Sequence, residues 1–179
     1  MAEFIKIKPS EITENPFKLI GGDWMLVTSA NDGDGTVGGV DYNTMTASWG
    51  GVGILWNKPV AYVFIRPQRH TFGFTEKNER MTLSFFTEEY RSALTFCGRQ
   101  SGRDFDKAKE CSLTPVFESN ESGRAAWFDE AKLVLKVKKL YADTLKKDCF
   151  FSEDGVNNYP SNDFHTVYVC EIEEVLAKA

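Results

Sequence analysis

Residues 164–175 read F-H-T-V-Y-V-C-E-I-E-E-V, and this stretch carries the clearest structural signal in the chain. Apolar and polar side chains alternate along much of it. Successive side chains of a strand point to opposite faces, so this alternation predicts a half-buried β-strand that closes the fold.

Toward the N-terminus, three further stretches are typical of strands. They are F-K-L-I-G-G-D-W-M-L-V-T-S-A (17–30), A-Y-V-F-I-R (61–66) and M-T-L-S-F-F (81–86). In the first of them, the strand is expected after a bend at Gly21-Gly22. A turn, N-D-G-D-G-T, then lets residues 36–41 return as a hairpin partner. Residues 127–141 fit a strand or a helix equally well.

Short helices are expected between these strands. Pro67 suits the first turn of a helix over residues 68–78, and Thr87 can cap a second helix that stops at Gly98. A third short helix is expected around residues 103–110.

The order of elements lacks a regular βαβ alternation. We therefore expect a mainly β fold with inserted short helices, an antiparallel barrel rather than a doubly wound sheet. Because no linker or repeat interrupts the chain, residues 1–179 are expected to form a single domain in which residues 1–16 are a polar lead-in.

Composition excludes several classes of function. The formal net charge of −5 argues against broad nucleic-acid binding, which needs a basic face. No stretch approaches the ~20 apolar residues of a membrane helix, and the N-terminus lacks the apolar core of a signal peptide. We therefore expect a cytoplasmic protein without a membrane partner. The aromatic content of 13% indicates a large aromatic core or a site for flat rings.

The cysteines indicate reduced thiols rather than a metal site or a disulfide framework. Cys97, Cys111, Cys149 and Cys170 form no C-x-x-C pair and no zinc-site spacing with either histidine. In a cytosolic protein such thiols are usually reduced and partly buried.

Gly33-Asp-Gly-Thr-Val-Gly38 matches the G-x-G-x-x-G pattern of dinucleotide-binding proteins. That fingerprint also needs a helix to begin there, so that its N-terminus faces the pyrophosphate. The following residues, G-V-D-Y-N-T, are not helix-forming, and a hairpin turn is the better interpretation. A separate Rossmann domain for a nicotinamide cofactor is therefore not expected.

Residues 42–57 contain no charged side chain, and N-T-M-T-A-S-W-G-G (43–51) is the most informative part of the chain. Hydroxyl groups and small residues let backbone N–H groups approach a ligand, and Trp49 can lie against a flat ring. The alternative is a plain polar strand and turn, and the residue types alone do not separate the two.

Arg66-Pro-Gln-Arg69-His70-Thr71 lies where a helix is expected to begin. Free N–H groups, the helix dipole, a hydroxyl and nearby cations together suit a phosphate. A second basic cluster, Arg99, Arg103 and Lys107 around Ser101-Gly102, is able to complete that cradle. Capped, solvated helix ends explain both segments equally simply.

His165 lies in the last predicted strand, and a lone histidine is more often structural than catalytic. A catalytic triad is not expected, because no G-x-S-x-G elbow is present.

Six segments resemble, in this order, the flavin reductase-like family with an FMN-binding split barrel. They are G-D-W-M-L-V-T-S, N-T-M-T-A-S-W-G-G, K-P-V-A-Y-V-F-I-R-P-Q-R-H-T, M-T-L-S-F-F, C-G-R-Q-S-G-R-D-F-D-K and D-F-H-T-V-Y-V-C-E-I. The resemblance covers residues 17–175, and flavoredoxin-type members look most similar. Phe164 separates Asp163 from His165, whereas the family pattern has Asp directly before His.

The resemblance implies a homodimeric, six-stranded Greek-key split barrel with FMN near the dimer interface. It assigns residues along the isoalloxazine ring and ribityl chain, namely Thr44, Met45, Thr46, Ala47, Ser48 and Trp49. It assigns the phosphate to Arg66, His70 and Thr71, and a place beside the ring to Ser84 and Phe85. From the next loop it adds Cys97, Gly98, Ser101, Gly102 and Lys107, and it gives His165 a catalytic place facing the nicotinamide or the flavin.

Three functions are compatible with this resemblance. The first is a reductase in which NAD(P)H reduces bound FMN, and the second is an electron carrier with tightly bound FMN and a protein redox partner. The third is a ligand-binding module without redox activity, because a fold alone does not fix a function.

Overall fold

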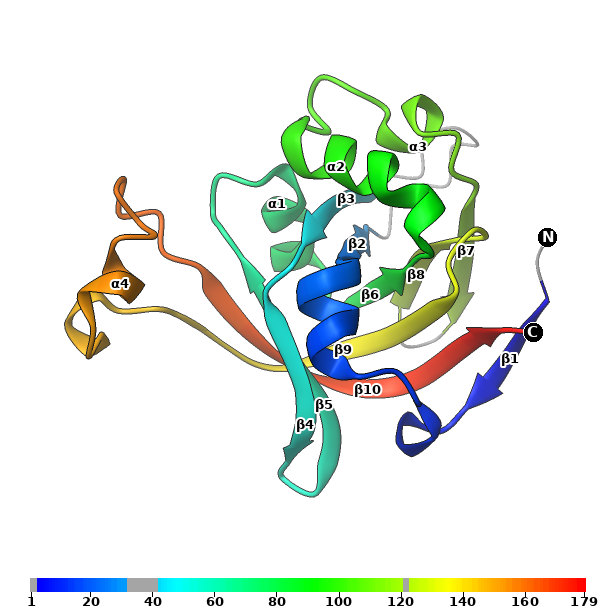
Figure 1. The fold of residues 1–179 in the computed structure, drawn as a ribbon, viewed down its shortest axis with the longest axis horizontal. Helices are drawn as coiled ribbons and strands as arrows, with labels where there is room; N and C mark the ends of the chain where they lie inside the picture. Colours follow the sequence, from blue (N-terminus) through cyan, green and yellow to red (C-terminus); the bar gives the residue numbers. More distant parts are fainter. Residues whose placement is uncertain (1–2, 32–41, 121–122) are drawn as a thin grey trace.

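A computed structural model describes residues 3–31, 42–120 and 123–179 (Figure 1). The described residues form ten strands: β1 (Phe4–Ile7), β2 (Met25–Ala30), β3 (Tyr42–Ala47), β4 (Gly50–Leu55), β5 (Lys58–Ile65), β6 (Arg80–Phe85), β7 (Pro115–Asn120), β8 (Gly123–Phe128), β9 (Leu133–Thr144) and β10 (Thr166–Lys178). The α-helices are α1 (His70–Lys77), α2 (Arg91–Arg99), α3 (Lys107–Glu110) and α4 (Glu153–Val156). Four short turns of other helix types are η1 (Pro9–Glu11), η2 (Lys18–Asp23), η3 (Glu88–Tyr90) and η4 (Lys147–Cys149). The expected mainly β fold with short helices is confirmed.

The strand predicted from residues 164–175 organises the main sheet. One side of β10 pairs antiparallel with β9 over most of its length. Its other side pairs with β5 near its start and with β1 near its end. The strand order through the sheet is β3-β2-β6-β9-β10-β5-β4, and β7 pairs with β8 in a separate hairpin.

The two ends of this sheet are neighbours in the chain. Strands β3 and β4 lie at opposite ends of the pairing order, yet only Ser48 and Trp49 separate them. The sheet must therefore curve round to bring its edges together, although the described residues show no pairing between these two strands. Gly50 follows the junction, and a Cβ there would lie 2.8 Å from the backbone oxygen of Tyr62.

Both faces of the curved sheet are covered, because alternate residues of its strands enter two separate cores. In β2, Met25 and Val27 belong to the core enclosed by the sheet, whereas Leu26 belongs to a second core. In β9, Leu135 and Val134 divide in the same way. Figure 1 shows α2, α3 and the β7–β8 hairpin on the side of the second core.

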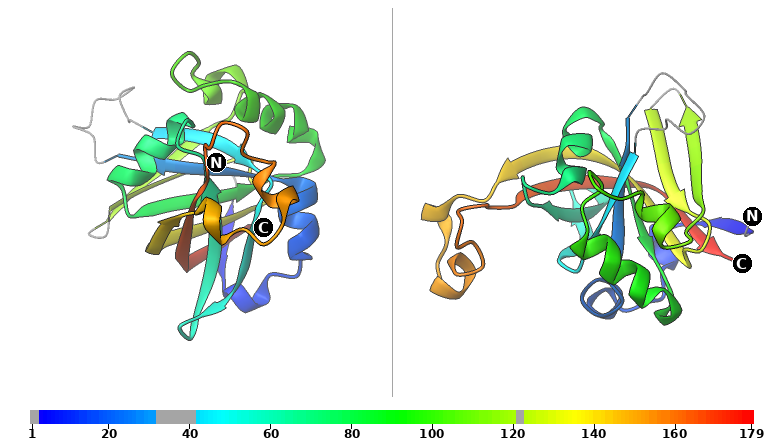
Figure 2. Two further views of the ribbon diagram at one scale, coloured as in Figure 1. Left: turned by 90° about the vertical axis from the view of Figure 1, so that its left-hand side faces the viewer. Right: turned by 90° about the horizontal axis from the view of Figure 1, so that it is seen from above.

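An arm formed by residues 145–165 projects from the body between β9 and β10. Figures 1 and 2 show this arm ending in α4, well away from the remaining helices. At its base, the backbone N–H of Leu145 donates to the carbonyl of His165 at 2.9 Å. This hydrogen bond joins the two ends of the arm, and His165 lies at that joint.

Several local expectations need correction. The strand predicted after the Gly21-Gly22 bend is β2, whereas the residues around that bend form η2, a π-helical turn, and residues 4–7 of the lead-in form β1. The ambiguous stretch 127–141 comprises the end of β8, a turn and most of β9, and Gly98 lies inside α2, which ends at Arg99. The G-x-G-x-x-G match and the predicted turn and hairpin partner over residues 31–41 lie almost entirely outside the described residues. The six-stranded count stays a prediction, because eight described strands share the main sheet.

Candidate functional site

A cavity of about 190 Å³ opens at the junction of the sheet's two edges. The residues around it come from the end of β3, the end of β5, the loop before α1 and the start of β10. They are Met45, Thr46, Ala47, Ser48, Trp49, Phe64, Arg66, Arg69 and His165. We call this cavity the ring pocket, because the rings of Trp49, Phe64 and His165 form part of its wall. Backbone and two guanidinium groups form other parts of it.

His165 is largely buried in the wall of the ring pocket, with only 8% of its surface exposed. Its ring lies 5.4 Å from that of Trp49 and 6.3 Å from that of Phe64, measured between centroids. Burial, helped by the nearby Arg66 guanidinium, lowers the pKa of His165 to about 4. The imidazole is therefore neutral near pH 7, and it acts there through hydrogen bonds and packing rather than through a charge.

Arg66 connects the ring pocket to the projecting arm. Its guanidinium pairs with the Asp163 carboxylate and donates to the carbonyl of Asn158 at 2.9 Å. Gln68 donates to the same carboxylate at 2.6 Å. Arg66 is thus bound to residues of the arm, and its side chain lines the ring pocket.

A second cavity, of about 100 Å³, adjoins the ring pocket and shares Arg69 with it. We call it the anion pocket, because three of its residues are arginine or lysine. It lies between the start of α1 and the loop that follows α2, and its lining residues are Gln68, Arg69, His70, Thr71, Arg99, Gln100, Ser101, Gly102 and Lys107.

Two cations of the anion pocket are fixed by backbone carbonyls near the end of α2. Lys107 is 5% exposed, and its Nζ donates to the carbonyls of Thr44 at 2.8 Å and Cys97 at 2.9 Å. Arg69 donates to the carbonyl of Gly98 at 2.8 Å. The Cys97 and Gly98 carbonyls are among the last of α2 and carry partial negative charge, which favours the buried Lys107 and the half-buried Arg69. Burial nevertheless lowers the pKa of Lys107 to about 8.

The loop over Lys107 depends on a glycine. A Cβ on Gly102 would lie 1.8 Å from Oδ1 of Asn43, which is closer than atoms can approach. Nδ2 of Asn43 in turn donates to Oγ1 of Thr71 at 2.7 Å. Gly102 therefore allows the loop to lie directly against β3 and α1.

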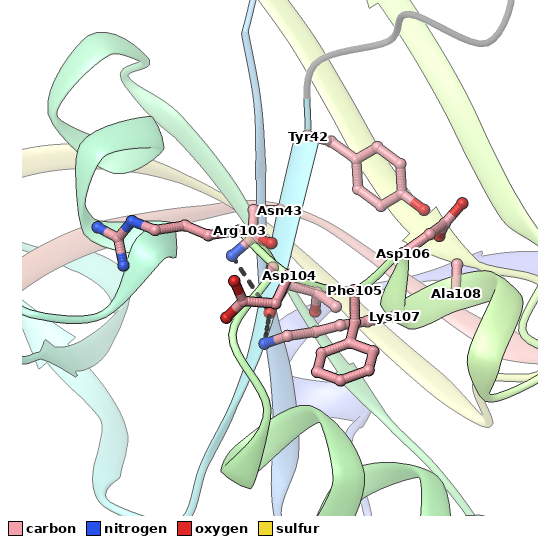
Figure 3. A pocket seen from close by; sticks show the side chains of 10 residues that line it. Tyr42, Asn43, Arg103, Asp104, Phe105, Asp106, Lys107 and Ala108 are labelled. Atoms are coloured by element: carbon pink, nitrogen blue, oxygen red, sulfur yellow. Dashed lines mark hydrogen bonds between the residues drawn. The ribbon is translucent and has the colours of Figure 1, made fainter.

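A third cavity, of about 350 Å³, lies beyond Gly102 and Lys107, which line both it and the anion pocket. Figure 3 shows Tyr42 and Asp106 on one side of this cavity and Arg103 on the other. Its polar walls continue the site away from the ring pocket.

The structure brings most of the predicted site residues together from distant parts of the chain. Thr46, Ala47, Ser48, Trp49 and His165 meet at the ring pocket, and His70, Thr71, Ser101, Gly102 and Lys107 meet at the anion pocket. Thr44, Cys97 and Gly98 contribute the carbonyls that hold the two cations.

Three predicted residues lie elsewhere than expected. Ser84 and Phe85 of β6 are fully buried and line none of these cavities, and Phe85 packs in the enclosed core. Arg66 faces the ring pocket and Asp163 rather than the anion pocket. Arg69 was named in the predicted phosphate segment but was not assigned to the ligand, although it lines both pockets. Its position in R-P-Q-R-H-T, one residue before α1, was the available signal.

Within residues 3–31, 42–120 and 123–179, no group of three His, Cys, Asp or Glu side chains is placed to hold a metal ion. No helix described there is both long and apolar enough to cross a membrane. The four cysteines are free thiols, of which Cys97 and Cys170 are buried.

Comparison of the fold with solved structures gives consistent matches. The flavoredoxin of Desulfovibrio vulgaris (Miyazaki F) superposes with a TM-score of 0.65 at 19% identity, over 96% of this chain and 77% of that one. An FMN-binding domain of a flavin reductases-like enzyme from Shewanella baltica OS155 gives 0.64 at 14% identity, over 99% and 78%. An FMN-binding protein from Thermus thermophilus gives 0.60 at 20% identity, over 94% and 75%.

These matches define the fold class. The chain has the fold of the FMN-binding, flavin reductase-like split-barrel proteins, flavoredoxin included, over nearly its whole length. No family model and no curated protein sequence matches the chain. The resemblance found in the sequence is therefore confirmed at the level of the fold.

Proposed function

We propose that this chain is a flavoprotein that binds FMN and transfers electrons, as a flavin reductase-like oxidoreductase. The observation that carries this proposal is the position of Arg69, which joins an aromatic-lined cavity to a smaller, strongly basic one. A ligand with a flat ring at one end and a phosphate at the other matches that arrangement.

The residues present fit FMN. The anion pocket supplies the buried Lys107, the half-buried Arg69, the Thr71 and Ser101 hydroxyls, and a loop that lies against β3 at a position where a Cβ does not fit. The ring pocket supplies backbone from Thr46 to Trp49 and a rim of aromatic rings. The ligand's ring would lie in the ring pocket and its phosphate between Arg69 and Lys107.

The chain's own groups have distinct tasks in this proposal. Bound FMN supplies the redox chemistry, accepting a hydride or single electrons. Lys107 and Arg69 would hold the phosphate, whereas Trp49 and Phe64 would pack against the flat ring. His165, which is neutral near pH 7, faces the reacting region as a hydrogen-bonding group.

NAD(P)H is the electron donor in the form of the proposal that we favour. Trp49 is 48% exposed, so the ring pocket stays accessible from solvent to a nicotinamide. The alternative is a flavoredoxin-type carrier that exchanges electrons with a protein partner. The fold match to flavoredoxin supports this alternative.

A homodimer around a six-stranded Greek-key barrel, with FMN near the interface, is part of the same proposal. Ile54 and Trp56, on the projecting β4–β5 hairpin, are 73% and 58% exposed. Ile54 also helps to line an apolar groove of about 610 Å³. Apolar surface of this kind usually marks an interaction site. Sedimentation at twice the chain mass is expected, and a stable monomer contradicts the dimer.

The visible absorption spectrum of the purified protein, before and after adding FMN and removing the excess, tests the central claim. A bound two-band flavin spectrum at about one per chain is expected, because the site is built for a single FMN. A colourless protein that retains none contradicts the proposal and favours a ligand module without redox activity. Rapid bleaching after mixing with NADPH or NADH supports the reductase. A bound flavin that is reduced by neither NADPH nor NADH favours the carrier.

A further inference from the structure

Tyr159 lies in the arm, between α4 and β10, and contacts the histidine of the ring pocket. It is 7% exposed, and its ring packs against Phe150 and Phe164, with centroid distances of 5.9 and 4.9 Å. Its hydroxyl oxygen lies 2.9 Å from Nδ1 of His165. The phenol is therefore fixed by packing, while its polar end reaches the imidazole.

Burial raises the pKa of Tyr159, so the phenol keeps its proton, and the nearby Arg66 guanidinium favours its use as the donor in this hydrogen bond. The guanidinium lies over the Tyr159 ring, 5.0 Å from the centroid, where it draws electron density out of the phenol. A phenol beside a cation is a stronger O–H donor and a weaker acceptor. The same guanidinium helps to keep the imidazole of His165 neutral, so one of its two nitrogens carries a lone pair that can accept a hydrogen bond.

Asp163 keeps Arg66 in this position. The carboxylate binds both Arg66 and Gln68, and the carbonyl of Asn158 accepts a further hydrogen bond from Arg66. The charged groups that influence His165 most are Arg66 and Arg69, from the loop before α1, and Asp163, from the arm. The arm therefore carries the aromatic group and the carboxylate, and the loop before α1 carries the two cations.

We propose that Tyr159 is a positioning residue that donates its hydroxyl proton to Nδ1 of His165 and so places the imidazole proton on Nε2. The described residues provide no hydrogen-bond partner for Nε2, and His165 lines the ring pocket. The neutral imidazole then offers one N–H donor to a carbonyl oxygen or ring nitrogen of the bound ligand. The identity of that ligand rests on the proposed function, whereas the tautomer does not.

Nitrogen-15 NMR of the imidazole side chains tests the tautomer in the full-length protein near pH 7. The chain has two histidines, so His165→Gln assigns the resonances unambiguously. We expect a protonated Nε2 and an unprotonated Nδ1 shifted by an accepted hydrogen bond. In Tyr159→Phe, which keeps the ring packing, the Nδ1 resonance is expected to move to the position of a nitrogen without a donor.

Tyr168→Phe is the matched control, because it also removes one buried phenol hydroxyl, hydrogen-bonded at 2.7 Å to Glu76. It should leave the His165 resonances in place. A wild-type protein with its proton on Nδ1 overturns the proposal. So does an Nδ1 resonance that Tyr159→Phe leaves unchanged.

Flavin binding provides a second readout that separates this proposal from the proposed function. If FMN binds, we expect Tyr159→Phe to retain its affinity within about threefold and to slow reduction by NAD(P)H about tenfold, the effect of one mispositioned hydrogen bond. An unchanged reduction rate in Tyr159→Phe overturns the proposed role of the Tyr159 hydroxyl as a positioning hydrogen-bond donor. Failure to bind FMN contradicts the proposed function and leaves the NMR result to decide the tautomer.

Discussion

Lys107 places a cation inside the protein, where it binds two backbone carbonyls and faces the anion pocket. We predict that Lys107→Met weakens FMN binding by about tenfold or more, because a charge-assisted phosphate contact is lost. Riboflavin, which lacks the phosphate, is the matched control and should lose little affinity. Equal losses for both ligands, measured by fluorescence titration, contradict the assignment.

The lowered pKa of Lys107 adds a pH dependence. With a pKa of about 8 in the free protein, the amine is charged below that pH and neutral above it. The FMN phosphate loses its second proton near pH ~6, so its charge is constant above neutrality. The ratio of FMN affinity to riboflavin affinity is therefore expected to fall as the pH rises through 8. A flat ratio between pH 7 and 9.5 excludes a role for the Lys107 charge.

Gly102 tests the close approach of the loop to β3. Gly102→Ala is expected to displace Asn43 from Thr71 and to lower FMN affinity about tenfold, through one lost buried hydrogen bond and local strain. Gly73→Ala is the control, because nothing lies within 4 Å of its Cβ position and alanine favours the helix. Titration and thermal unfolding of both variants give the comparison, and tight FMN binding by Gly102→Ala contradicts the prediction.

At the scale of elements, the junction between β3 and β4 determines how far the sheet curves. Gly50→Ala places a Cβ 2.8 Å from the Tyr62 backbone oxygen, which cannot move without disturbing the β4–β5 pairing. A loss of roughly 1–3 kcal/mol in the free energy of unfolding is expected from such strain. Gly53→Ala in the same strand has open space and should be neutral. Denaturant unfolding of the two variants distinguishes these outcomes.

The strands were predictable where their surroundings follow the simple alternation, as in β10. The π-helical turn over residues 18–23 was not predicted, because the Gly21-Gly22 pair indicates only a bend, and Leu19 and Ile20 fit a helical turn or a strand. Short apolar stretches do not distinguish the two by period alone. Most of the stretch 127–141 became β-structure because Val134 and Leu135 face two cores, which a helix at this position could not do.

At the scale of the whole molecule, burial of His165 links stability to pH. Its pKa is about 4 in the folded chain and near 6.5 when exposed, so between these values the unfolded state binds more protons. Stability is therefore expected to fall as the pH decreases from 6.5 to 4, by up to ~1.4 kcal/mol per pH unit from this group. Below pH 4 that loss is complete.

His165→Gln removes this contribution and is expected to flatten the pH dependence of unfolding between pH 6.5 and 4. The same comparison above pH 7 is the control, because the imidazole is then neutral in both the folded and the unfolded chain. A variant that loses stability with acid as steeply as the wild type contradicts the burial of a neutral histidine.

The sequence by itself determined the mainly β character, the segment order of a split barrel and most of the residues around the candidate site. These features depend on local alternation and on motifs that are contiguous in the chain. Only the tertiary structure decided which cation serves which pocket. Arg66 is drawn to Asp163, 97 residues away in the sequence, and this leaves Arg69 between the two pockets. Pairing of β5 with β10 brings Arg66 close to Asp163, and no local sequence pattern encodes that pairing.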